Sequence, residues 1–524
     1  MRSTSVRRIA PLALTPDPVV SFGMPPFLRR VLLVWLACVS TIANAASTDR
    51  RPNFIILFAD DQRADTLGAW GNRHIRTPHL DALVRRGFGF RANYCAGSNS
   101  GAVCIPSRAM LMTGRMWMHG NHAMTNTITF PQWFGDRGWR TFATGKWHNG
   151  RTAFARSFQE GRSVFFGGMA DHTRVPVVDY AHSTFSPVRT ATRFSSEEFA
   201  DAVIGFLKDA GTNQPFLCHV AFTAPHDPRN PLRESVEPYY RRKPPLPSNF
   251  LPQHPFDNGW MRGLRDEDLA AYPRNPDTVR EQLAEYYGLI SHLDSQVGRI
   301  LHALAQSPHA ANTYIVYASD HGLALGSHGL LGKQSLYEHS MRCPLILAGP
   351  GIPAGRETRH FTFLLDLFPT LCGLAGIEPP TGIDGRNLQP LWSGRPVRWR
   401  DSVFLAFTDS MRSIRDERWK LIVYPPIGMR QLFDLQSDPD ERVNLAGGRR
   451  TQATETRLLA LLREAQREAG DTCPLESHPT RPATIDLSHG YERKPDADQP
   501  SWIVEKYFGK PRTSDGSGPQ PGKR

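Results

Sequence analysis

The chain has 524 residues, of which 40% are hydrophobic, 10% aromatic and 21% charged. This composition is typical of a folded globular protein and excludes a chain that is disordered throughout. The 43 glycines and 43 prolines follow no period and the seven cysteines are sparse, which excludes collagen-like, coiled-coil and disulfide-scaffold proteins. The formal net charge of +12 favours an acidic ligand. Nucleic acid is not expected as a partner, because we find no clustered basic face with an aromatic platform.

The amino terminus predicts an export signal. Two arginines precede a short apolar run at residues 31–42, and a small-residue cleavage site then ends at Ala45. We therefore expect residues 1–45 to be a signal peptide and the mature protein, with a net charge of +8, to be secreted or periplasmic. The run is too short for a membrane span. Met24 offers an alternative start, and Cys38 an alternative site for a lipid anchor.

Four short apolar runs are predicted strands, and each is followed at once by polar or chargeable residues: residues 53–59, 141–143, 216–222 and 313–318. Helical patterns lie between them, most clearly at 279–304, where Thr278 and Glu281 predict a capping box. Strands that alternate with helices predict an α/β domain with a large, doubly wound, mostly parallel sheet. Such sheets bind ligands beyond the carboxyl ends of their strands, so the polar residues after the four runs are expected to form one site.

A second, smaller unit is expected after a connection at 381–394 that is rich in glycine, proline and asparagine. Predicted strands at 402–408, 411–414, 419–424 and 431–435 and a helix at 455–468 indicate a C-terminal α+β domain with an antiparallel sheet. The predicted organisation is an α/β catalytic domain at 50–395, the small domain at 396–472, and an irregular tail at 473–524 that is disordered from about 510, although 503–508 is expected to dock on the surface.

The most informative segment is CIPSRAMLMTGR, at residues 104–115. Pro106 and Ser107 suit a first helical turn and Gly114 suits a helix end, so Cys104 is predicted at the amino end of a short helix. The unpaired backbone N–H groups there favour an anion. A buried or disulfide-bonded cysteine is the alternative. No disulfide pairing can be assigned, because the cysteines are irregularly spaced.

This segment resembles the signature of the type I sulfatases, Cys-x-Pro-Ser-Arg followed by Thr-Gly-Arg. The resemblance runs from residue 52 to about 445 and includes Asp60-Asp61, Thr144-Gly145-Lys146-Trp147-His148, Ala224-Pro225-His226, Ser319-Asp320-His321-Gly322, Gly332-Lys333 and Leu432-Phe433-Asp434-Leu435. It implies an alkaline phosphatase-like fold. It also implies that a maturation enzyme oxidises Cys104 to formylglycine (3-oxoalanine).

The hydrolysis of a sulfate ester favours a bound metal ion near the nucleophile. A sulfate monoester carries one negative charge, and a second develops on the leaving oxygen as the bond between sulfur and that oxygen breaks. A hard divalent cation with oxygen ligands suits this reaction. Asp60, Asp61 and Asp320 offer carboxylates, and His321 and the modified Cys104 are further ligands. The resemblance implies Ca²⁺ or Mg²⁺, although many relatives have Asn in place of His321. A solvated strand end is the alternative for the Asp pair.

The resemblance also implies a nucleophile and its helpers. Hydrated formylglycine is a gem-diol, in which one oxygen attacks sulfur and the other later expels sulfate by reforming the aldehyde. Arg108 and Lys146 are implied to hold the diol, and His148 to take the proton that drives elimination. Lys333 and His226 are implied to bind sulfate and the leaving group, with His226 donating a proton to the alcohol oxygen.

Residues that read the substrate beyond its sulfate are less strongly indicated. Arg229 suits a second anionic group and Asp227 a sugar hydroxyl, but the two residues are equally well explained as a pair that braces their loop. Trp147 and Asn149 are candidates for lining the same pocket, whereas His328 is expected to be structural.

The sequence therefore predicts an exported sulfatase that hydrolyses a sulfate monoester on a sulfated carbohydrate. The carbohydrate part rests on analogy with relatives in sugar-degrading bacteria and on the export signal. One alternative is a phosphonate or phosphodiester hydrolase of the same superfamily, which predicts phosphate release far above sulfate release. Another is a non-catalytic protein that binds sulfated glycans, which predicts an unmodified Cys104 and no turnover.

Overall fold

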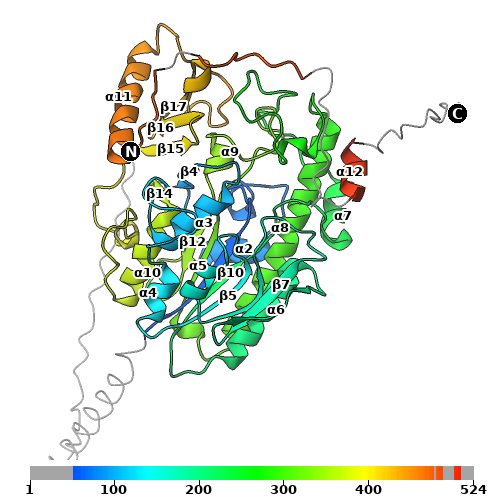
Figure 1. Cartoon of the computed structure of the whole chain (residues 1–524), viewed down its shortest axis with the longest axis vertical. Helices are drawn as coiled ribbons and strands as arrows, with labels where there is room; N and C mark the ends of the chain where they lie inside the picture. The colour runs from blue at the N-terminus through cyan, green and yellow to red at the C-terminus, as the bar shows by residue number, and fades with distance from the viewer. Residues whose placement is uncertain (1–50, 477–478, 488–500, 509–524) are drawn as a thin grey trace, which may run out of the picture. The chain divides into compact units, whose positions relative to one another are not determined.

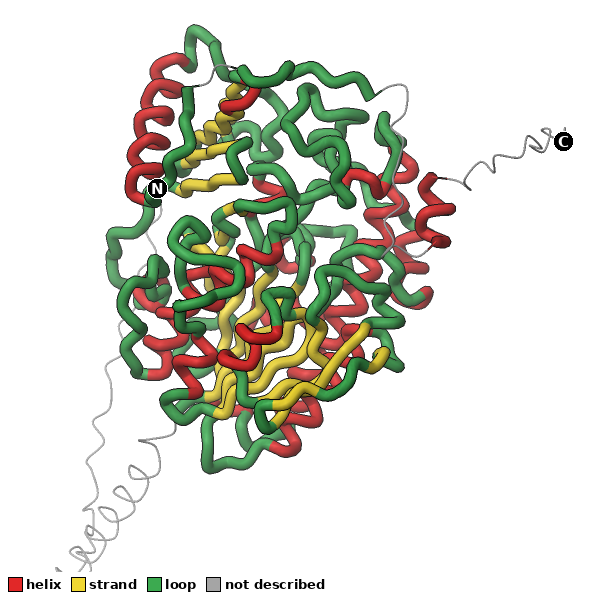
Figure 2. The backbone as a smooth tube through the Cα atoms, viewed as in Figure 1, coloured by secondary structure: helices red, strands yellow, loops and turns green. Residues whose placement is uncertain are grey.

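The computed structural model describes residues 51–476, 479–487 and 501–508. The predicted signal peptide, Cys38 and the tail beyond residue 508 lie outside the described residues. Within them, a large sheet has the strand order β13-β2-β12-β11-β1-β10-β5-β6-β7-β8, and β9 pairs with β7. Figure 1 labels its strands β12, β10, β5 and β7, and Figure 2 shows strands in yellow. The sheet strands are β1 (Asn53–Ala59), β2 (Phe88–Phe90), β5 (Arg140–Lys146), β6 (Glu160–Phe165), β7 (Pro176–Ala181), β8 (Thr184–Phe185), β9 (Arg189–Thr190), β10 (Phe216–Ala221), β11 (Thr313–Ser319), β12 (Leu345–Ala348) and β13 (Arg356–Thr358).

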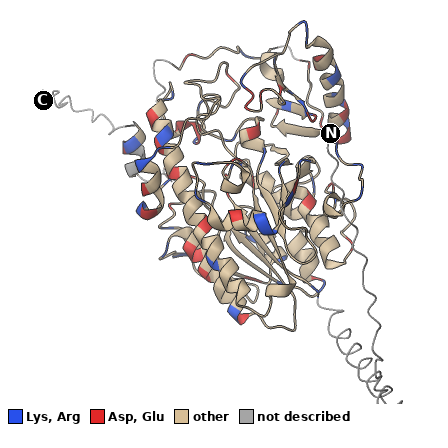
Figure 3. Ribbon diagram, turned by 180° about the vertical axis from the view of Figure 1, so that it is seen from behind, with Lys and Arg blue, Asp and Glu red and all other residues tan. Residues whose placement is uncertain are grey.

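The central strands β11, β1, β10, β5 and β6 are parallel to one another, and antiparallel strands follow at both ends of this block. Side chains of β1 alternate between two cores: Phe54 and Ile56 belong to one, Ile55 and Leu57 to the other. Strands β1, β10 and β11 contain no Asp, Glu, Lys or Arg, whereas Figure 3 shows charged residues on the helices and loops around them. Burial of both faces explains these continuous apolar runs.

Helices cover both faces of the sheet, which confirms the predicted doubly wound architecture. One core receives side chains from α3 (Cys104–Thr113), α4 (Phe130–Gly135), α5 (Arg151–Ser157) and α10 (Leu367–Ala375). The other receives side chains from α2 (Pro78–Arg86), α6 (Ser195–Asp209) and α8 (Pro276–Ala305).

The amino end of α8 differs from the prediction. The helix begins at Pro276 and is capped by Asn275, whose side chain accepts hydrogen bonds from the backbone N–H groups of Asp277 and Thr278. The expected capping box at Thr278 is therefore wrong, because Asn275 followed by proline at the first helical position is a stronger start signal.

A second sheet has the order β18-β17-β16-β15-β4. It contains β15 (Val403–Phe407), β16 (Met411–Arg415), β17 (Trp419–Tyr424) and β18 (Met429–Asp434), which are antiparallel as predicted, and α11 (Gln452–Glu468) packs on it. The unpredicted member is β4 (Gly97–Ser98), which runs parallel to β15. Gly97 has φ +100°, and a Cβ atom there would lie 1.9 Å from the carbonyl oxygen of Ala406, so this contact requires glycine.

The remaining elements are β3 (Asn93–Tyr94), β14 (Thr362–Phe363), α7 (Arg233–Arg241), α9 (Glu338–Met341), α12 (Ser501–Phe508) and short 3₁₀ helices at η1 (Gly68–Trp70), η2 (Glu267–Leu269), η3 (Ala310–Asn312), η4 (Leu364–Asp366), η5 (Gln389–Trp392) and η6 (Pro425–Ile427). Docking of α12 is as predicted, since Lys506 Nζ lies 3.0 Å from Glu281 Oε1 and 2.5 Å from Glu285 Oε1 on α8. The six cysteines of the described residues are unpaired thiols. Every helix among the residues that the structure describes is too short or too polar to cross a bilayer.

Candidate active site

The residues that follow the four predicted strands meet at one edge of the sheet. Asp60 and Asp61 follow β1, His226 follows β10, Lys146 is the last residue of β5, and Asp320 follows β11. These strands are neighbours in the order β11-β1-β10-β5, and parallel strands present their carboxyl ends at the same edge. The structure therefore brings together the side chains that the sequence places far apart.

A backbone turn directs the two adjacent aspartates toward the same point. Asp61 has φ +66°, in the left-handed region, and its N–H donates to Asp320 Oδ1 over 2.9 Å. Asp60 Oδ2 lies 2.5 Å from Lys146 Nζ, and the two oxygens of Asp61 lie 2.9 and 3.1 Å from Lys333 Nζ. All of these side chains are buried. The turn thus prevents the opposite orientations that neighbouring residues have on a regular strand.

The donor set fits a divalent cation. Asp60, Asp61 and Asp320 each offer an oxygen within 4.8 Å of the others, and the side chains of Cys104, Asp320 and His321 form a second such group. Among the described residues, Asp60 Oδ1 and His321 Nε2 are buried without a hydrogen-bond partner. Burial and the neighbouring Asp60 raise the pKa of Asp320 well above its ordinary value. A cation held by these groups would bind both atoms, although Arg108 Nη2 already lies 3.3 Å from Asp60 Oδ1, and would offset the repulsion between the carboxylates.

Cys104 is the first residue of α3, and Gly114, in the left-handed conformation, ends that helix, as predicted. Cys104 Sγ lies 3.2 Å from His148 Nδ1 and 3.8 Å from Lys146 Nζ. Burial alone would raise the pKa of the thiol, but Lys146 and Lys333 lower it to about 7. Cys104 therefore lies in a strongly electropositive setting.

His148 is held as a neutral imidazole. Burial and the positive charges of Lys146 and Arg108 lower its pKa to about 2. Arg108 itself donates through Nη1 to the carbonyl oxygen of Lys146 over 2.8 Å, and its Nη2 lies 3.3 Å from Asp60 Oδ1 and 3.4 Å from Asp320 Oδ2. A neutral imidazole 3.2 Å from Sγ is able to accept a proton from the group at position 104.

His226 and Lys333 also meet, with Lys333 Nζ 3.3 Å from His226 Nε2. His226 Nδ1 lies 2.7 Å from the carbonyl oxygen of Asp227, which can only accept, so Nδ1 carries the hydrogen. Burial and Lys333 lower the pKa of this histidine in spite of the nearby Asp61. At rest, His226 therefore presents an unprotonated Nε2 to Lys333.

The two predicted substrate residues lie in different surroundings. Asp227 Oδ1 is 3.2 Å from His226 Nδ1, at the site. Arg229 is buried, and its Nη1 donates to Gln282 Oε1 of α8 over 2.6 Å. Asn149 Nδ2 donates to the carbonyl oxygen of Ile105, beside Cys104, and so supports the start of α3. The roles of Asp227 and Arg229 in substrate binding stay predictions.

Sequence reasoning missed Arg265, which lies between α7 and α8. Its Nη2 is 3.2 Å from His226 Nε2 and 3.3 Å from Asp227 Oδ1. It also missed His172, whose Nε2 lies 3.0 Å from the carbonyl oxygen of His226. Neither residue belongs to a recognisable motif, so only the fold reveals their proximity to the site.

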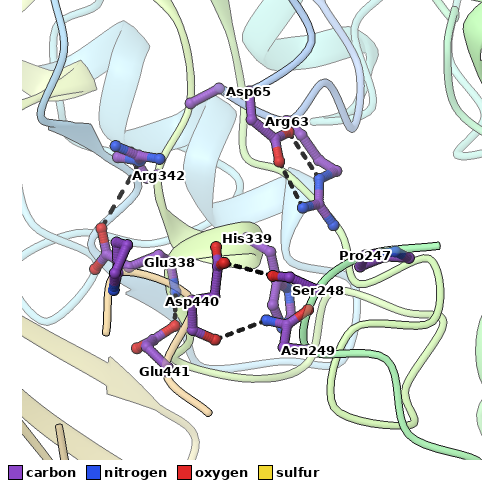
Figure 4. Close-up of a pocket in the computed structure, with 12 residues that line it drawn as sticks. Arg63, Asp65, Pro247, Ser248, Asn249, Glu338, His339, Arg342, Asp440 and Glu441 are labelled. Atoms are coloured by element: carbon purple, nitrogen blue, oxygen red, sulfur yellow. Dashed lines mark hydrogen bonds and ion pairs between the residues drawn. The ribbon is translucent and has the colours of Figure 1, made fainter. Parts of the chain in front are cut away.

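A separate polar pocket of about 130 Å³ lies beside α9 (Figure 4). Among its charged residues, Arg63 pairs with Asp65 and Glu338 with Arg342, and Asp440 accepts a hydrogen bond from Ser248. His328, near this pocket, stacks on Tyr337 with ring centroids 3.9 Å apart, as expected for a structural residue. This pocket lies between α9 and the segment after β18, and its lining does not include the active-site residues that follow β1, β5, β10 and β11.

A family model described as Sulfatase matches residues 52–377, and a second, described as N-sulphoglucosamine sulphohydrolase, C-terminal, matches residues 326–468. The chain belongs to the sulfatase family. It is therefore a sulfuric ester hydrolase, and the resemblance seen in the sequence is confirmed.

Individual members of the family are similar along most of their length. An N-acetylglucosamine-6-O-sulfatase from Bacteroides thetaiotaomicron is 26% identical over 525 residues, which cover 85% of this sulfatase and 92% of that protein. An arylsulfatase from Clostridium perfringens is 28% identical over 441 residues, which cover 75% of this sulfatase and 90% of that protein. A solved structure of a protein in complex with its substrate D-glucosamine-2-N,6-O-disulfate superposes with a TM-score of 0.70 at 23% identity. The superposition covers 82% of this sulfatase and 100% of that chain. This last likeness confirms the fold.

Proposed function

We propose that this sulfatase is exported and hydrolyses a sulfate monoester on a sulfated carbohydrate, using formylglycine at position 104 and a bound Ca²⁺. The observation that carries the proposal is the meeting of Cys104, Lys146 and His148 beside the carboxylates of Asp60 and Asp320. The sugar sulfates named for the relatives support the carbohydrate class. The sequence of residues 1–45 supports export.

The donor atoms suit a hard divalent cation, which we propose to be Ca²⁺. Asp60, Asp61 and Asp320 supply carboxylate oxygens, the ligands that hard cations prefer, and His321 completes the set. The cation would supply charge for the sulfate oxygens, and formylglycine, as its hydrate, would supply the oxygen nucleophile. Lys146 Nζ, 3.8 Å from Cys104 Sγ, would hold the group at position 104.

Two histidines move protons at opposite ends of the site. His148 Nδ1 faces position 104 as a neutral base and would take the proton whose removal releases sulfate. His226 and Lys333 would meet the leaving alcohol. Because His226 Nε2 is an acceptor at rest, the proton for the alcohol oxygen would come from the ammonium of Lys333, directly or through His226.

The test uses protein made in a host that contains a formylglycine-generating enzyme. Sulfate release is measured from defined sulfated mono- and oligosaccharides, together with phosphate release from matched phosphate esters. We expect sulfate release from at least one sulfated sugar and formylglycine at position 104 by peptide mass spectrometry. Phosphate release that exceeds sulfate release by orders of magnitude would assign the enzyme to the phosphoester class. Glycan binding with an unmodified Cys104 and no turnover would indicate a binding protein.

Export is tested separately. Cell fractionation and amino-terminal sequencing of the mature protein are expected to place it outside the cytoplasm, with its first residue after Ala45. A chain that keeps residues 1–45 in the cytoplasm would contradict this part of the proposal.

A further inference from the structure

The segment that contains Arg265 is fastened to the backbone around Lys333. The Glu267 carboxylate accepts from the N–H groups of Leu331 and Gly332, the latter over 2.7 Å. Asp266 Oδ2 accepts from Gln334 Nε2 over 3.0 Å. Residues on both sides of Lys333 are therefore tied to the two residues that follow Arg265.

Glu267 is itself locked in place. The buried guanidinium of Arg274 pairs with its carboxylate and donates through Nη1 to its carbonyl oxygen over 2.9 Å. This buried pair makes the segment rigid, because breaking it would leave an uncompensated charge away from water.

Within this frame Arg265 has a fixed direction. Asp266 Oδ1 accepts from its Nη2 over 2.6 Å and from its Nε over 3.0 Å. The same Nη2 then lies 3.2 Å from His226 Nε2, an atom that is also 3.3 Å from Lys333 Nζ. An oxygen that contacts both Lys333 and His226 can therefore also reach Arg265.

Exposure shows which part of the substrate Arg265 would meet. The side chains of Lys333 and His226 are 2% and 3% exposed, whereas that of Arg265 is 28% exposed. Sulfur must lie toward the buried Cys104, so the alcohol extends toward solvent. Arg265 is thus on the side of the leaving group.

We propose that Arg265 is a catalytic residue that donates a hydrogen bond to the departing alcohol oxygen. The inference rests on the proposed function. As a sulfur–oxygen bond forms to the nucleophile at position 104, the bond from sulfur to the alcohol oxygen breaks and its electron pair stays on that oxygen. Lys333 and His226 deliver the proton, and Arg265 keeps its own protons, because a guanidinium does not deprotonate in proteins. Its contribution grows as negative charge develops.

The test compares Arg265→Gln and Arg265→Lys with the parent enzyme on a graded series of aryl sulfates and on a sulfated monosaccharide. Removing one donor to a developing oxyanion costs about 10²–10³-fold in kcat, so we expect that loss for the monosaccharide. We expect a loss below about 5-fold for 4-nitrophenyl sulfate, whose leaving group needs little stabilisation, and a partial recovery with lysine. KM should change little.

Arg262→Gln is the matched control, since Arg262 is an exposed arginine in the same segment, and it should retain parental kinetics. Thermal melting checks the fold of each variant. Equal losses on activated and unactivated esters, or no loss on either, would overturn the assignment. A parent enzyme that releases no sulfate from any ester would instead refute the proposed function.

Ground-state binding provides a second readout that does not require turnover. In a Cys104→Ala background, calorimetry with the sulfated monosaccharide should show less than about a 5-fold change in affinity on Arg265→Gln, because the hydrogen bond strengthens only as the alcohol oxygen gains charge. An affinity loss as large as the loss in kcat/KM would make Arg265 an ordinary binding residue and overturn the proposal.

Discussion

The phenol of Tyr286 clamps the backbone turn at Asp61. Its Oη donates to the Asp61 carbonyl oxygen over 2.6 Å and accepts from the Arg63 N–H over 2.9 Å. Asp61 is thereby held in its left-handed conformation, which directs both neighbouring carboxylates toward Asp320. A residue of α8, with no part in the chemistry, thus shapes the proposed metal site.

Tyr286→Phe should weaken this turn. The phenylalanine ring fills the same space but leaves two buried backbone groups without partners, which costs about 1–3 kcal/mol of folding free energy for each group left unpaired. We expect a lower unfolding midpoint and weaker Ca²⁺ binding, measured by urea denaturation and calorimetry. Tyr287→Phe, at the next position on α8, is the control for loss of a hydroxyl. Unchanged calcium affinity in Tyr286→Phe would contradict the clamp.

Calcium should stabilise the protein. A cation that binds only the folded state adds about 2.7 kcal/mol at a concentration 100 times its Kd. We expect Tm to rise with CaCl₂ and to fall after treatment with a chelator, followed by differential scanning fluorimetry. Asp320→Asn, which removes one of the three mutually repelling carboxylates, should abolish most of the calcium response. A Tm that is independent of calcium in the parent enzyme would exclude this site.

Cys104→Ala should abolish turnover, because it removes the residue for which we propose conversion to formylglycine. The substitution deletes one sulfur atom at the start of α3, and we expect the free energy of unfolding to change by no more than about 1 kcal/mol. Sulfate release and chemical denaturation check the two parts. Cys473→Ala, at a half-buried thiol outside the site, should keep full activity. Normal turnover by Cys104→Ala would end the proposed mechanism.

Acid should destabilise the fold through His219. This buried histidine of β10 lies among Phe58, Phe130 and Phe158, and burial together with Arg108 lowers its pKa to about 3. In the unfolded chain its pKa is about 6.5. Between these values the unfolded chain binds a proton that the folded protein does not, so stability falls as pH falls below 6.5. The loss by pH 5 is about 2 kcal/mol.

His219→Phe should remove this part of the pH dependence. The free energy of unfolding of the parent and the variant is measured by urea denaturation from pH 8 to pH 5, and the difference between them should shift in favour of the variant as pH falls. His74→Gln, at an exposed histidine, serves as the control. Parallel pH profiles for the parent and His219→Phe would show that His219 is not the responsible group.

Much of the fold and the site could be predicted because apolar runs end at chemically distinctive residues. A run such as residues 53–59 identifies a buried strand, and Asp60-Asp61 directly after it identifies the ligand-binding edge. The left-handed conformation of Asp61 is not encoded locally, since it depends on Tyr286, far along the chain. Sequence therefore identified the carboxylates and a turn at the strand end, but not the tyrosine that holds this turn.

Other features depend on contacts that leave no local pattern. Arg265 lies in a segment without periodicity. Glu267 accepts from the N–H of Gly332 and Asp266 accepts from the side chain of Gln334, and these contacts on both sides of Lys333 bring Arg265 to the site. Arg229, in a more suggestive sequence context, is buried against Gln282 instead. In both cases the decisive partners are distant in sequence.

The pairing of β4 with β15 has a consequence for the order of events during synthesis. Gly97 and Ser98, shortly before Cys104, emerge from the ribosome long before Ala406 and Phe407, their neighbours in the second sheet. Until those late residues are made, the stretch leading to Cys104 lacks its native neighbour in that sheet. The proposed modification of Cys104 is therefore expected before the C-terminal strands have been translated, while this stretch still lacks its neighbour in the sheet.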